Sequence, residues 1–346
     1  MLNLVCSPSV VQNGTGLTSI GCSFTSKYEL FLRIIEKSSS ILESLEFEDD
    51  SLLNIRSLIF DEDYQPIVYP RLQRLDFSNK TGSMLDERLR VEKPIAPFPV
   101  LRHLKWNSMY VFEDDALFRG NSDTLEYMYI VVDTNLVDIL QRHKVFCDGR
   151  YSQLCNVSVG MAEANDTRPL DTDVFLAFAL RTIVPTTKAL TLDLFDMFNI
   201  VDIASENQHL RNIQDLNLSG YIGSMRELIA LIKLLPNMTK LTCNPEAIHL
   251  DPDSIQLSDL IDNLYTEYYP LSHRFRYWEV LVDSRQQVDH AATSALTFAI
   301  LCTNFVLAYI PLGYREEFGQ YIRNAIEGGQ YDRHIDKIQR LFRILY

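Results

Sequence analysis

Asp61-Glu62-Asp63 and Glu113-Asp114-Asp115 are two runs of acidic side chains that could act as general acids or bind a cation. Both kinds of chemistry need a supporting set of donors or ligands held at fixed positions. The first run falls at the expected tip of a β-hairpin. The second lies where a helix is expected to begin, and acidic residues there are favoured by the helix dipole. The sequence therefore gives neither run a catalytic role.

Histidine and cysteine, which commonly build catalytic and metal sites, are dispersed along the chain. The seven histidines do not pair with a plausible nucleophile, and the six cysteines form no Cys-x-x-Cys pair and no zinc-type spacing with histidine. The sequence contains no phosphate-binding loop, no His-Glu-x-x-His helix and no Gly-x-Ser-x-Gly elbow. We therefore expect a non-enzymatic protein with no catalytic residues, no metal site and no cofactor. An enzyme whose residues assemble only on folding stays an alternative.

Side chains suited to protein recognition recur at equivalent positions of three successive repeats between residues 74 and 129: Arg74, His103, Lys105, Asn107, Tyr127 and Tyr129. Tyrosine and arginine commonly anchor interfaces because they are large, amphipathic and specific in their contacts. We expect these six residues to form a contact patch that prefers an acidic or aromatic segment of a partner protein. The flanking residues are expected to be acidic or small. A solvated strand surface with incidental tyrosines is the alternative.

The six residues lie within or directly after a sequence pattern, here called the phrase, that occurs nine times along the chain. It consists of an apolar residue, two variable residues, an apolar residue, one variable residue and an apolar residue. Its middle apolar residues lie 24 to 33 residues apart, and they are Ile20, Leu45, Leu75, Leu104, Met128, Val157, Leu190, Leu216 and Leu241. Phrase and spacing are typical of the strand of a leucine-rich repeat. Because strand side chains alternate, the residues one before, one after and three after the middle one point outward. Only Val131 and Ala189 are aliphatic at these outward positions.

Helical patterns lie between the phrases, for example over 28–39 and 173–183, and Ser224 with Glu227 forms a capping box before a further helix. The sequence therefore predicts an α/β leucine-rich-repeat solenoid of the ribonuclease-inhibitor type. Parallel strands would line its concave face and helices its convex face. One repeat cannot cover its own apolar side, so stacking of neighbours supplies the core.

The domain organisation follows from where the phrase is regular. Residues 1–250 are expected to form the repeat array, with a β-hairpin inserted near 55–70. Residues 251–346 are expected to form degenerate repeats and a helical C-terminal cap of the same solenoid, with strand middles near Val280 and Val306. Residues 291–314 form an uncharged stretch that is long enough to span a membrane. A buried helix over 291–302 and a buried strand over 305–310 explain the same residues better.

Charge and targeting signals limit the choice of partner and compartment. The 46 acidic against 32 basic residues give a net charge of −14, which argues against general nucleic-acid binding because phosphate backbones need clustered positive charge. No signal peptide is visible at the start of the chain, and no metal-type or paired cysteines are present. We expect a cytoplasmic or nuclear protein with a protein partner and with neither nucleic acid nor a membrane as partner.

Four stretches carry a family resemblance: 69–75 (YPRLQRL), 98–104 (FPVLRHL), 115–127 (DALFRGNSDTLEY) and 274–278 (RFRYW). They resemble a group of uncharacterised leucine-rich-repeat-like proteins from early-diverging fungi, similar in outline to F-box/LRR proteins. The likeness covers roughly residues 40 to 345. It implies no catalytic residues. Relatives of this kind often begin with an F-box-like segment that docks onto a ubiquitin ligase core, and this chain has no recognisable F-box before its first repeat.

Two functions of different classes follow. The first is a non-enzymatic recognition scaffold that binds a protein through its concave strand face. The second is a substrate receptor of an SCF-type ubiquitin ligase that has lost, or is missing, its F-box, with a ligase adaptor as partner. An activator of a nucleotide switch built on repeats is a third, weaker hypothesis.

Overall fold

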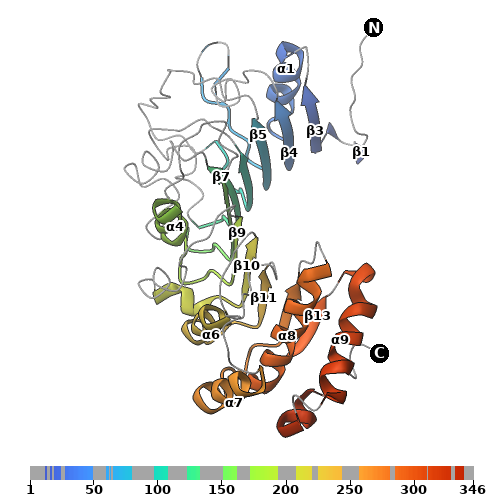
Figure 1. Ribbon diagram of the computed structural model, residues 1–346. Helices are drawn as coiled ribbons and strands as arrows, with labels where there is room; N and C mark the ends of the chain where they lie inside the picture. Colours follow the sequence, from blue (N-terminus) through green and yellow to red (C-terminus); the bar gives the residue numbers. More distant parts are fainter. Residues whose placement is uncertain are drawn as a thin grey trace. The chain divides into compact units, whose positions relative to one another are not determined.

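The computed structural model describes the strands, most helices and the turns that join them (Figure 1). The described residues are 12–13, 16–17, 19–24, 28–49, 60–61, 63, 65–79, 97–107, 123–132, 151–161, 172–193, 208–219, 225–243, 257–280, 285–309, 311–328 and 332–338. They divide into two compact units, Met1–Thr187 and Lys188–Tyr346.

The first unit contains six parallel strands that pair in chain order. They are β3 (Ser19–Phe24), β4 (Ser44–Asp49), β5 (Arg74–Asn79), β6 (His103–Asn107), β7 (Tyr127–Val132) and β8 (Asn156–Met161). A short antiparallel pair, β1 (Gln12–Asn13) and β2 (Gly16–Leu17), precedes them. The described helices of this unit are α1 (Tyr28–Ser38) and α4 (Thr172–Arg181).

The second unit continues the same construction with five parallel strands paired in chain order. They are β9 (Ala189–Asp193), β10 (Asp215–Ser219), β11 (Lys240–Cys243), β12 (Tyr277–Val280) and β13 (Val306–Tyr309). The helical segments are η3 (Gln208–Asn212), α6 (Met225–Leu234), α7 (Leu257–Tyr268), α8 (Arg285–Leu301), η5 (Leu312–Tyr314), α9 (Arg315–Glu327) and η6 (Asp332–His334). Helices α7, α8 and α9 pack in sequence, one against the next (Figure 1).

The predicted strand phrase is confirmed in register. The middle apolar residue of each of the nine phrases is the second residue of its strand. Within each unit these middle residues pair with one another across neighbouring strands, as Leu75 does with Leu104 and Leu104 with Met128. All nine are buried, with Ile20 the most exposed at 7%. The chain is therefore an α/β leucine-rich-repeat solenoid in each of its units.

Neighbouring repeats are tied together by one recurring backbone contact. The Glu43 carbonyl accepts hydrogen bonds from the amides of Gln73 (2.8 Å) and Arg74 (3.1 Å). The Gln73 carbonyl accepts in the same way from Arg102 and His103, both at 2.9 Å. The pattern returns at the carbonyls of Arg102, Glu126, Lys188, Gln214 and Thr239. Because the same carbonyl repeats in each unit, it fixes the strands in one register.

A further buried position, absent from the predicted phrase, lies three residues before its first apolar residue. The carbonyl of this earlier residue accepts a hydrogen bond from the amide of the first apolar residue of the phrase. Leu72 donates in this way to Tyr69 (3.3 Å) and Leu101 to Phe98 (3.2 Å). The same turn recurs at Tyr151, Val184, Leu210 and Leu235, and all six of these residues are at most 3% exposed. Tyr69 and Phe98 also pack together, with ring centroids 5.4 Å apart. This position extends the repeat's core beyond the strand.

The prediction of Val280 as a strand middle is wrong, and Val306 is one residue away from its strand's middle. Leu241 pairs with Trp278, and Trp278 pairs with Leu307. Trp278 is fully buried and packs edge-on against Phe298 of α8 at 5.4 Å, while its indole NH lies 3.2 Å from the sulfur of Cys243. The largest side chain of this strand therefore takes the inward position and sets the register.

The uncharged segment forms the predicted helix and strand, as α8 and β13. Residues 291–302 are buried without interruption. Its buried hydroxyls are paired: Thr297 donates to the Thr293 carbonyl (2.9 Å), and Thr293 lies 3.1 Å from the Tyr321 hydroxyl of α9. Among the helices in the described part of the chain, none is long and apolar enough to cross a membrane.

The predicted hairpin near 55–70 lies partly outside the described residues. Within them, Phe60 and Pro66 form an isolated antiparallel bridge. Asp61 closes the turn between them, because its carboxylate accepts hydrogen bonds from the amides of Asp63 (3.0 Å) and Gln65 (2.7 Å). At the other end, 332–338 begin with η6 and continue as helix. The predicted boundary near 250 stays a prediction.

Candidate protein-binding face

The register of β5, β6 and β7 brings the six predicted recognition residues onto one side of three adjacent strands. Arg74, His103 and Tyr127 lie in one row across the strands. Lys105 and Tyr129 lie in the next row, and Asn107 lies in the third. Neighbouring strands are about 4.8 Å apart, and alternate residues of one strand are about 7 Å apart. We call these six residues, together with Asp76, the recognition face.

The apolar residues of the same strands determine which way the recognition face points. Leu75, Leu104 and Met128 are at most 1% exposed. Phe77 and Trp106 also point inward and pack together, with ring centroids 4.7 Å apart. A slip of one residue would expose this row and bury the polar one, so burial specifies the register strongly.

Asp76 is the residue of the recognition face that the sequence analysis placed among the outward positions but did not assign to the patch. Its side chain is only 7% exposed, and it lies 3.4 Å from the Lys105 ammonium and 3.8 Å from the Arg74 guanidinium. It occupies the same row as Lys105, one strand away. One carboxylate thus offsets part of the charge of two cations, and the net charge of the three groups is +1.

The two cations remain accessible although they are paired with Asp76. The side chains of Arg74 and Lys105 are 58% and 45% exposed. At this exposure, each cation can contact a partner group while it stays beside the nearly buried Asp76. The cationic half of the recognition face is therefore available for contact.

The aromatic half of the recognition face lies beside the cations. The rings of His103 and Tyr127 are 5.8 Å apart and tilted by 36°. The Lys105 ammonium lies 6.0 Å from the centre of the Tyr129 ring, which is the outer limit of a cation–π contact. His103 is exposed, and Tyr127 and Tyr129 are half-buried. Half-burial fixes the rings while it leaves part of their surface exposed.

The strands on either side differ from the recognition face. On β4, Glu46 is exposed and lies beside Asp76, as predicted for an acidic flank. The side chain of Glu48 is outside the description. On β8, Asn156 is exposed, whereas Ser158 is 7% exposed and lies beside Tyr129. Among the strands β4 to β8, the described charged and aromatic side chains that are accessible therefore lie on β4, β5, β6 and β7.

The remaining candidates for chemistry occupy structural positions or lie outside the described residues. Burial raises the pKa of Cys243 and of Cys302 to about 12, so both thiols stay protonated at neutral pH. In the part of the chain that the structure describes, no three His, Cys, Asp or Glu side chains are grouped so that they could hold a metal ion. The run Glu113-Asp114-Asp115 lies outside that part.

Comparison with known proteins gives a structural similarity only. No family model and no curated protein matches the sequence. Among solved structures, the chain is similar to an internalin, inlF, from Listeria monocytogenes str. 4b F2365. The TM-score is 0.34 and the sequence identity 10%, and the match covers 84% of this chain and 80% of that chain. The repeat geometry of the chain itself carries the fold assignment, and the resemblance to fungal F-box/LRR proteins stays a prediction.

Proposed function

We propose that the protein is a non-enzymatic recognition scaffold that binds a protein partner through the recognition face. The observation that supports this proposal is the convergence of two exposed cations, one histidine and two half-buried tyrosines on three adjacent strands. Arginine and tyrosine are the residue types that most often dominate the energetics of protein interfaces.

The chemistry of the face indicates what the partner carries. A carboxylate of the partner would lie near Arg74 and Lys105, whose charge Asp76 offsets only in part. An aromatic or apolar group next to that carboxylate would lie on Tyr127 and Tyr129. Because this patch has a net charge of only +1 and the protein −14, we infer a protein segment and not a nucleic acid as the partner.

The experiment that tests this proposal is affinity capture with the tagged protein from its own cells, quantified by mass spectrometry. The wild type is compared with Lys105→Ala/Tyr127→Ala, and the thermal unfolding of both is measured first. A partner that is enriched with the wild type and depleted at least about tenfold with the double variant supports the proposal. Equal recovery of every enriched protein by a folded double variant contradicts it.

The same experiment tests the ubiquitin-ligase hypothesis, which the resemblance to F-box/LRR proteins favours. A substrate receptor contacts the ligase adaptor and the substrate through different surfaces. Recovery of ligase adaptor subunits with both forms, with loss of another protein only in the double variant, would identify such a receptor.

A further inference from the structure

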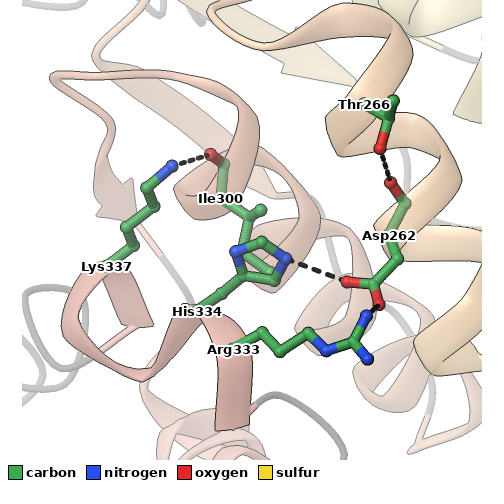
Figure 2. Close-up of polar contacts among 6 residues, drawn as sticks. All are labelled: Asp262, Thr266, Ile300, Arg333, His334 and Lys337. Carbon is green, nitrogen blue, oxygen red and sulfur yellow. Dashed lines mark hydrogen bonds and ion pairs between the residues drawn. The ribbon is translucent and has the colours of Figure 1, made fainter.

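Residues 332–338 of the second unit contact α7 and the end of α8 through Arg333, His334 and Lys337 (Figure 2). We call this segment the strap. Its seven residues carry Arg333, His334 and Lys337, and also the acidic Asp332 and Asp336, so its formal net charge is zero when His334 is neutral. The strap lies on a surface formed by α7, the turn after α7 and the end of α8, all in the second unit.

Asp262 of α7 holds the first part of the strap. Its carboxylate forms an ion pair with the Arg333 guanidinium and lies 3.2 Å from His334 Nε2, within hydrogen-bond distance (Figure 2). The Arg333 side chain is 81% exposed, the Asp262 side chain 31% and the His334 side chain 9%. The His334 ring also packs against Tyr265 of α7 at 4.6 Å.

Two tyrosines of α7 and its C-terminal turn hold the second part. The rings of Tyr265 and Tyr269 stack at 4.6 Å. The Lys337 ammonium lies 3.5 Å from the centre of the Tyr269 ring and 4.2 Å from that of Tyr265. It also donates a hydrogen bond to the Ile300 carbonyl of α8 at 3.3 Å (Figure 2). These contacts match those that bind cations in aromatic sites.

The polar contacts described above hold the strap through Arg333, His334 and Lys337, and the fully buried Ile338 is its apolar anchor. A carboxylate, two stacked rings and a carbonyl oxygen together form a surface that accepts cations spaced four residues apart. We propose that this surface is a receptor for a short segment with an arginine and a lysine four residues apart, filled in cis by the strap, and that the strap can open locally and be replaced by such a segment in trans. This proposal is independent of the recognition face.

Local opening is tested by hydrogen exchange, followed by mass spectrometry, on the whole chain. Asp262→Asn removes the charge that holds Arg333 and His334. Glu267→Gln removes an exposed carboxylate of the same helix that makes none of the strap contacts described above. We expect the amides of 333–338 to exchange about fivefold faster in Asp262→Asn and at the wild-type rate in Glu267→Gln. Amides of β12 and α8 should be unchanged in both variants.

Either of two results would overturn the opening of the strap. One is exchange of 333–338 that Asp262→Asn leaves unchanged. The other is exchange in the wild type at the rate of an unstructured peptide, because the strap would then not be held.

Replacement in trans is tested with a fluorescent peptide of residues 330–340 and the variant Arg333→Ala/His334→Ala/Lys337→Ala, which keeps Asp262, Tyr265 and Tyr269 and removes the strap side chains that contact them. We expect saturable binding that weakens about tenfold when Asp262→Asn is added, because the charged hydrogen bonds are lost. Addition of Glu267→Gln should leave it unchanged, which separates the site from the general negative charge of the protein. Absent binding, or equal weakening by both additions, would contradict the receptor.

Discussion

The ion pairs on the outward faces of the two units differ in their distances and in the exposure of their cations. On β11 and β12 of the second unit, the Lys240 ammonium lies 2.8 Å from the Glu279 carboxylate, which also accepts a hydrogen bond from the Thr242 hydroxyl at 3.2 Å. The Lys240 and Glu279 side chains are 35% and 30% exposed. On the recognition face the ion-pair distances are longer and the cations more exposed. The same repeat can therefore hold its outward charges in a close pair or leave them more exposed.

On the outward face of the second unit, two pKa values are shifted by the surroundings. On β10, burial and, secondarily, Glu279 raise the pKa of Asp215, although Lys240 opposes this shift. The hydrogen bond to Glu279 raises the pKa of Lys240. The outward groups of the second unit are thus coupled to one another, as expected for a surface that serves stability.

The largest effect is expected where inward and outward residues of one strand are compared. Trp278→Ala should lower the free energy of unfolding by about 3–5 kcal/mol, because it empties a fully buried site against Phe298. Its neighbour Tyr277 is 42% exposed, and Tyr277→Ala should cost about 0.5 kcal/mol. Equilibrium unfolding in urea measures both. Similar costs for the two variants would contradict the alternation.

A smaller effect should separate the two charged faces. Glu279→Gln removes the charged partner of Lys240 and replaces the carboxylate acceptor of Thr242 by a neutral amide oxygen, and we expect a loss of about 1 kcal/mol. Arg74→Gln removes a mostly exposed cation while Lys105 stays beside Asp76, and we expect a loss within about 0.5 kcal/mol. Urea unfolding of both variants at low salt tests this difference. A larger cost for Arg74→Gln would show that the first face is also built for stability.

The smallest effect concerns the pH dependence contributed by Asp215. Its folded pKa lies above the unfolded value, so the folded state binds more protons in between. The contribution of Asp215 to stability is therefore present below its unfolded pKa and is lost as pH rises through the folded value. Asp215→Asn should flatten this slope, which thermal unfolding between about pH 3 and pH 7 measures. A steeper decline in the variant would contradict the sign.

Sequence predicted the strands well because two periods coincide. Alternation of apolar and polar residues within a strand and the spacing of about 28 residues between strands both had to fit, so Leu75, Leu104 and Met128 could be placed to the residue. Those three positions also placed the six recognition residues in adjacent rows. The register of the candidate face was thus predictable from the local pattern.

The errors arose where spacing replaced the phrase, or where contacts are made between distant parts of the chain. Phe275, Trp278 and Val280 match the three apolar positions of the phrase, and this match places Trp278, not Val280, at the middle of the strand. The buried position at Tyr69 and Phe98 also had a signal, since an apolar residue recurs there in most repeats. No sequence pattern indicated the burial of Asp76 between two cations or the contact of the strap with α7. Both depend on side chains from different repeats.

The most direct test of the central claim is a matched comparison of the two faces in one capture experiment. Lys105→Ala/Tyr127→Ala alters the recognition face, and Lys240→Ala/Tyr277→Ala removes the same residue types from the outward face of β11 and β12. With both variants folded, we predict that the partner captured by the wild type is lost only with the first. Retention of that partner by the first variant, or equal loss with both, would contradict binding through the recognition face.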